Sequence, residues 1–145
     1  MTEKIILLII SIIMLVITLK KGDKLTIFLT TGLTIGILIT LTKIPILLFI
    51  GSIIYMLTAL GITIISIKRK DLTKLNQVTI LLSGIWAFVG NLSSIMHWPY
   101  AEIFRLSMII PILFFIISLF YGMIKRKEFG YLSIMNLEFA FHLFR

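Results

Sequence analysis

His97, Trp98 and Pro99 are the most distinctive residues of this sequence that could do chemistry, and Glu102 and Arg105 follow within two helical turns. An imidazole, a carboxylate and a guanidinium placed together at a membrane boundary could bind an ion or relay protons. We favour a structural interpretation over this one. Trp98 would then anchor the chain at the headgroups, with Pro99 beginning a helix and His97 capping one. Glu102 and Arg105 have the spacing of an ordinary surface ion pair.

Other reactive groups are sparse. The chain has no cysteine, which excludes disulfides, thiolate metal sites and thiol nucleophiles. It contains no phosphate-binding loop, no zinc-protease motif and no nucleophile elbow. His97 and His142 are expected on opposite sides of a membrane and so cannot share a metal. No carboxylate is expected between the membrane interfaces, where a proton or sodium path usually needs one. We therefore expect no catalytic site, no metal and no cofactor.

The composition indicates an all-α membrane protein. Hydrophobic residues make up 59% of the 145 residues and charged residues 14%, with a mean hydropathy of +1.14. A soluble domain would be roughly half apolar and about a quarter charged. The net charge of +8 comes from lysines that flank apolar runs, so anionic lipid headgroups are the expected partner and nucleic acid is not. Residues 1–145 are predicted to form one helical bundle.

Five transmembrane helices are predicted, at residues 5–19, 25–42, 45–67, 78–96 and 101–124. About 20 residues cross a bilayer core, so the apolar stretch from 25 to 67 must fold back, and Pro45 suits the first turn of the returning helix. Pro111 should kink the last helix. Residues 5–19 lack a small-residue cleavage site, which favours a retained helix over a signal peptide.

The loops set the expected topology. Three loops, after the first, third and fifth helices, hold ten of the fourteen Lys and Arg residues. The positive-inside rule then places the N-terminus outside and the C-terminus inside. Residues 131–145 contain Glu138 and are short for a span, so we expect an amphipathic helix on the inner leaflet, with partner docking as the alternative.

Two hairpins resemble each other. Residues 36–45 and 90–99 share a glycine, a leucine and a proline at matching places, which predicts a duplicated hairpin in parallel orientation. Secondary transporters more often carry inverted repeats. Small residues on the same helices predict close helix packing, namely Gly32, Gly36, Gly84 and Gly90, with Asn91 as a hydrogen-bonding residue between helices.

The second hairpin also carries a family resemblance. Residues 90–101 read Gly-Asn-Leu-Ser-Ser-Ile-Met-His-Trp-Pro-Tyr-Ala. This resembles the motif Gly-Ala-Leu-Phe-Lys-Ile-Met-His-Trp-Pro-Gly-Ala of small bacterial multi-pass proteins, and the transmembrane hairpin of GldL, a gliding-motility and type IX secretion motor protein. The resemblance implies a bacterial inner-membrane protein. The membrane glutamate and the long cytoplasmic region of that motor protein are absent, so the resemblance does not imply ion conduction.

These observations predict a non-enzymatic inner-membrane bundle that self-associates or serves as a subunit of a membrane complex. The alternatives are an ion or proton pathway that uses His97, Glu102 and Arg105, and a small-solute transporter.

Overall fold

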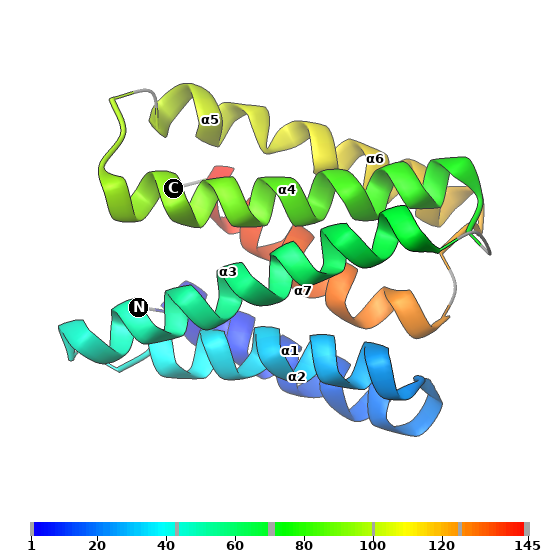
Figure 1. Ribbon diagram of the computed structural model, residues 1–145, viewed down its shortest axis with the longest axis horizontal. Helices are drawn as coiled ribbons and strands as arrows, with labels where there is room; N and C mark the ends of the chain where they lie inside the picture. The colour runs from blue at the N-terminus through cyan, green and yellow to red at the C-terminus, as the bar shows by residue number, and fades with distance from the viewer. Residues whose placement is uncertain (1, 43, 70–71, 100, 125, 144–145) are drawn as a thin grey trace.

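The computed structural model describes residues 2–42, 44–69, 72–99, 101–124 and 126–143. Every regular element in these ranges is an α-helix. In chain order they are α1 (Thr2–Lys21), α2 (Lys24–Thr40), α3 (Pro45–Lys68), α4 (Lys74–Met96), α5 (Ala101–Ser107), α6 (Ile109–Phe120) and α7 (Arg126–Leu143). The helices lie side by side along one long axis (Figure 1). The prediction of an all-α bundle is confirmed.

Three of the described helical stretches are long and apolar enough to cross a membrane: Pro45–Lys68, Lys74–Ser93 and Glu102–Phe120. The helix α2 is apolar but shorter. Apolar side chains such as Phe28, Leu57 and Phe120 lie 73%, 63% and 86% exposed on the outside of the bundle. A large exposed apolar surface is what a lipid-embedded bundle requires. The count of five spans stays a prediction.

Local sequence explains where the helices begin. The Asp23 carboxylate accepts a hydrogen bond from the Thr26 backbone N–H at 2.9 Å and so caps α2. Thr73 caps α4 through its hydroxyl, and Pro45 occupies the first turn of α3. The reversal expected before Pro45 is therefore confirmed, although Lys43 lies outside the described residues.

The predicted helix at 101–124 is interrupted. The helix α5 ends at Ser107 and α6 begins at Ile109, with the Met108 N–H bonded to the Arg105 carbonyl at 3.1 Å. Pro111 is buried three residues later. Because proline has no N–H and its ring crowds the carbonyl four residues back, that of Ser107, the helical ladder cannot continue there. The irregularity that Pro111 predicts in this helix is therefore present, as the break between α5 and α6.

The C-terminal helix α7 differs most from expectation. We predicted a surface helix over residues 131–145, but α7 begins at Arg126 and lies inside the bundle, and residues 144–145 fall outside the described ranges. It packs against α1, α2, α4, α5 and α6. Leu132, Ile134 and Met135 are completely buried. Consecutive residues of α7 are buried because other helices contact several of its faces. A helix buried in this way does not need apolar residues on one face and polar residues on the other.

This placement changes the expected topology. The helix α7 runs the length of the bundle, so its end lies beside the start of α1 (Figure 1). We call this the N-terminal end of the bundle, where α2 and α4 also end. The opposite end, with the connections after α1, α3 and α6, is called the basic end. The start of α1 and the end of α7 therefore lie at one end of the bundle, and so do His97 and His142, unlike the arrangement predicted from five spans. The side of the membrane that this end faces stays a prediction.

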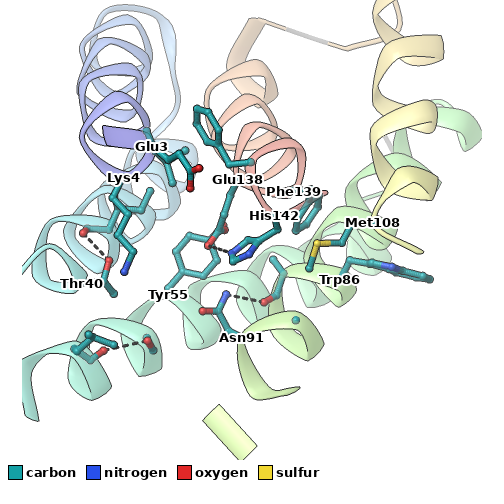
Figure 2. Close-up of a pocket in the computed structure, with 17 residues that line it drawn as sticks. Glu3, Lys4, Thr40, Tyr55, Trp86, Asn91, Met108, Glu138, Phe139 and His142 are labelled. Carbon is teal, nitrogen blue, oxygen red and sulfur yellow. Dashed lines mark hydrogen bonds and ion pairs between the residues drawn. The ribbon is translucent and has the colours of Figure 1, made fainter. Parts of the chain in front are cut away.

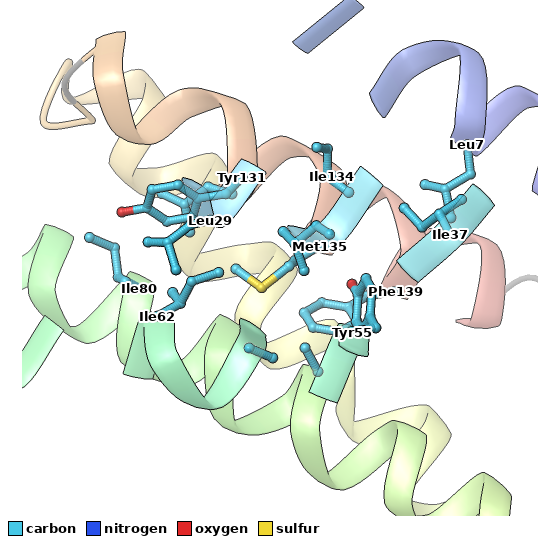
Figure 3. Packing of buried hydrophobic residues seen from close by; sticks show 14 of the residues in the cluster. Leu7, Leu29, Ile37, Tyr55, Ile62, Ile80, Tyr131, Ile134, Met135 and Phe139 are labelled. Atoms are coloured by element: carbon cyan, nitrogen blue, oxygen red, sulfur yellow. The ribbon is translucent and has the colours of Figure 1, made fainter. Parts of the chain in front are cut away.

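The core lies around α7 (Figure 3). Tyr131, Ile134, Met135 and Phe139 of α7 meet buried residues from four other helices, Leu7, Leu29, Ile37, Ile62 and Ile80. Glycines allow α2 and α4 to approach α3 closely. A Cβ on Gly36 of α2 would lie 3.0 Å from the Tyr55 Cβ of α3, and one on Gly84 of α4 would lie 3.0 Å from the Ala59 carbonyl of α3.

Candidate functional site

The predicted cluster at residues 97–105 is only partly assembled. Glu102 and Arg105 form an exposed ion pair at 2.8 Å. His97 ends α4 in a left-handed conformation with φ of 49°, and its N–H bonds to the Ser93 carbonyl. Among the described residues, no hydrogen bond or ion pair joins His97 to Glu102 or Arg105. The geometry therefore matches the structural interpretation of a helix cap followed by a surface ion pair.

The remaining members of that cluster lie at the surface. Trp98 is 43% exposed, and its N–H continues the cap by bonding to the Ser93 carbonyl at 3.2 Å. Pro99 is exposed, and Tyr100 lies outside the described residues. The Arg105 guanidinium reaches toward the end of α7, where the His142 carbonyl is 3.5 Å away. Arg105 thus links the predicted cluster to a neighbouring region that the prediction did not include.

That region is a pocket of about 280 Å³ inside the N-terminal end of the bundle (Figure 2). Helices α1, α2, α3, α4 and α7 all contribute to its wall, and Met108 adds the junction of α5 and α6. Its apolar wall includes Leu7, Trp86, Phe139 and Phe141. The pocket brings together residues that are up to 139 positions apart, from Glu3 to His142.

The interior polar groups of the pocket come from α3, α4 and α7. Tyr55 of α3 is 2% exposed, and its hydroxyl has no hydrogen-bond partner among the described residues. The Glu138 side chain of α7 is 15% exposed. One of its oxygens, Oε1, lies 4.0 Å from the His142 Nε2, and the other, Oε2, is buried with no hydrogen-bond partner in the described part of the chain. Unsatisfied buried polar atoms are rare in proteins and call for an explanation.

Asn91 lines the pocket, and its predicted role between helices stays a prediction. Its amide donates to the Ala87 carbonyl of its own helix at 3.1 Å, while its side chain faces the pocket near Tyr55 (Figure 2). Gly90 also lines the pocket, close to Met108. Gly32 faces Thr58 across the α2–α3 contact. At the mouth of the pocket lie Glu3 and Lys4, both exposed at the start of α1.

A second group of buried polar residues lies at the basic end. Glu128 of α7 is completely buried, where it accepts a hydrogen bond from the Asn76 amide at 2.7 Å and pairs with Arg69 at 3.2 Å. Between the two ends, the Asn136 amide donates to the Ser83 hydroxyl at 3.1 Å. Two carboxylates, Glu128 and Glu138, therefore lie within the bundle, each near one end of α7.

Sequence reasoning missed the pocket because it placed α7 outside the bundle. Tyr55, Glu138 and His142 were not candidates, although Glu138 and His142 are one helical turn apart. The available signal was the helix length. Counted from Arg126, α7 has 18 residues and extends about 27 Å, close to the thickness of a bilayer core.

Neither protein-family models, nor curated proteins, nor solved structures match the chain. A metal site also lacks support, because no group of three or more His, Cys, Asp or Glu residues comes together in the described ranges. The pocket's own geometry therefore carries the functional argument.

Proposed function

We propose that this protein is a non-enzymatic, multi-pass protein of the cytoplasmic membrane that binds a small solute in the pocket at the N-terminal end of the bundle. The observation that carries the proposal is the buried Tyr55 hydroxyl, which faces a cavity of about 280 Å³ without a partner. Pockets of this kind, largely apolar with a few convergent polar groups, are typical of small-molecule sites.

The charge distribution supports an orientation. The connections at the basic end and their flanking residues hold ten of the fourteen Lys and Arg residues of the chain. Under the positive-inside rule this end faces the cytoplasm, so the pocket opens on the opposite side and both ends of the chain lie there. A solute would reach the pocket from outside the cell, past Glu3 and Lys4.

The test is a stability screen on the full-length protein in detergent. A panel of small cations, anions and neutral solutes should contain at least one compound that raises the unfolding temperature of the native protein. The same compound should have no effect on Thr40→Trp, which fills the pocket, and should still act on Leu57→Trp, a control on the exposed face. The proposal fails if no compound stabilises the native protein, or if Thr40→Trp responds as the native protein does.

A second candidate function is self-association, as the sequence suggested. A groove of about 310 Å³ runs over α7 between α1 and α6. Its floor includes the Ser133 hydroxyl and the Asn136 carbonyl oxygen, both buried without a partner among the described residues. Small and polar residues of this kind mediate helix association in membranes. Ala140→Trp should fill the groove and abolish crosslinked dimers in the membrane, while Leu57→Trp should leave them unchanged.

The other hypotheses gain less support. An ion or proton pathway through the cluster at residues 97–105 would need His97 to act with Glu102 and Arg105, but Glu102 and Arg105 already neutralise each other at the surface. The resemblance to the GldL hairpin and the duplication of the hairpins stay predictions. Neighbouring genes of gliding or secretion systems would favour the resemblance.

A further inference from the structure

We infer that the pocket binds a small organic ammonium ion, with its N–H groups directed at Glu138 and its apolar part against the aromatic wall. The inference rests on the proposed function, because it names the class of solute that the same pocket takes. It follows from three features of the pocket: its unpartnered acceptors, the distribution of its charges, and its apolar wall.

The unpartnered polar atoms call for a donor. An ionised carboxylate accepts hydrogen bonds and donates none, and the Glu138 Oε2 is buried without a donor among the described residues. The Tyr55 hydroxyl, likewise buried, can accept one bond and donate another. Burial of a carboxylate is costly unless the charge is paired and hydrogen-bonded. A ligand with several N–H groups and a positive charge satisfies both requirements at once.

The nearby cations do not meet this need inside the pocket. The His142 Nε2 lies 4.0 Å from the Glu138 Oε1, which is a long ion pair when the imidazole is protonated but is beyond hydrogen-bond distance. Arg105 is engaged by Glu102 at 2.8 Å. Lys4 is exposed at the mouth, beside Glu3, and bulk water screens its charge. The interior of the pocket therefore presents one carboxylate, Glu138, and no equally buried cation in the described chain.

The wall fits the remainder of such a ligand. Phe139 is 1% exposed, and Trp86 and Phe141 also line the pocket. Aromatic faces attract ammonium groups and pack against apolar carbon atoms. A volume of about 280 Å³ corresponds to roughly nine waters at ~30 Å³ each, and hence to a ligand of about nine non-hydrogen atoms. Phenethylammonium has this size, a primary ammonium and an aromatic body, so it serves as the probe.

The experiment compares three probes that share a phenethyl group on the purified full-length protein by calorimetric titration: phenethylammonium, the neutral phenethyl alcohol and the slightly larger, anionic phenylpropionate. We expect phenethylammonium to bind most tightly. Glu138→Gln should weaken phenethylammonium binding about tenfold to a hundredfold, because the charge that strengthens the hydrogen bond is lost. Tyr55→Phe should weaken it less, and Glu102→Gln, a carboxylate outside the pocket, should leave it unchanged.

A second variant tests whether the pocket favours a positively charged ligand. Lys4→Met removes a like charge at the mouth, so it should tighten phenethylammonium binding severalfold at low salt. The matched control is Lys24→Met, an exposed lysine at the basic end. If Lys4→Met weakens phenethylammonium binding instead, Lys4 does not repel the bound charge and the ammonium class is overturned.

The outcomes distinguish this inference from the proposed function. Tighter binding of the alcohol or the anion, or an unchanged affinity in Glu138→Gln, overturns the ammonium class while the pocket remains a ligand site. Absence of any stabilising compound in the wider screen overturns both. If Glu138→Gln does not fold, the ranking of the three probes on the native protein and the result for Lys4→Met decide the question.

Discussion

Replacement of Glu128 by alanine tests whether α7 lies inside the bundle. The Glu128 side chain is completely buried, pairs with Arg69 at 3.2 Å and accepts from the Asn76 amide at 2.7 Å. Removal of one partner of a buried ion pair costs about 3–5 kcal/mol, because the other charge stays behind without compensation. Arg69 is only 16% exposed, so water replaces the lost carboxylate poorly. We expect a loss of about 3 kcal/mol or more in the free energy of unfolding.

The assay is reversible unfolding of the full-length protein in mixed micelles, followed by circular dichroism. Glu102→Ala is the matched control, because Glu102 forms an ion pair of similar length but is 77% exposed, and exposed pairs contribute at most about 1 kcal/mol. In the double variant of Glu128→Ala and Arg69→Met, the loss should be smaller than the sum of the single losses. If Glu128→Ala costs no more than Glu102→Ala, α7 does not pack as described, and the pocket built on it fails too.

Three further predictions address the packing and the topology. Gly84→Ala should destabilise the protein by about 1–3 kcal/mol in the same assay, because the new methyl group meets Thr63 of α3. Gly61→Ala should be nearly neutral, because its new methyl group would lie 3.7 Å from the Leu29 side chain, an ordinary van der Waals contact. Trp86→Phe should cost about 1 kcal/mol, because the indole N–H that donates to the Ser107 hydroxyl at 3.0 Å is lost; an unchanged stability would contradict this. A phosphatase fused after the last residue should be active, because that end is proposed to face outside the cytoplasm. If the enzyme is active only when it is fused within residues 69–73, the proposed orientation is the wrong way round.

Much of the fold follows from local patterns in the sequence. Pro45 was predicted to begin a helix, and it occupies the first turn of α3. Asp23 and Thr73 cap α2 and α4 by equally local contacts, although the fourth helix was predicted to begin only at residue 78. The disturbance near Pro111 follows from its missing N–H. These features depend on residues within one helical turn of one another, and such effects can be deduced without knowing the packing.

The position of α7 could not be deduced in the same way. Its apolar residues do not form one face, and Glu138 and Asn136 interrupt them, which is typical of a surface segment or of a helix enclosed on all sides. Only contacts with α1, α2, α4 and α6 decide between these two cases, and those contacts join residues far apart in the chain. The pocket depends on the same placement of α7, since Tyr55 of α3 and Glu138 of α7 line it together.

The central position of α7 has a consequence for biosynthesis. The helices α1 to α6 leave the ribosome first, and until α7 arrives Asn76 and Ser83 have no partner from it. A membrane-embedded intermediate with exposed amide and hydroxyl groups is a substrate for chaperones and proteases that survey the bilayer. Completion of this protein therefore depends on the packing of its final helix against helices that are already inserted, so a chain that stops before Arg126 should be degraded rather than accumulate.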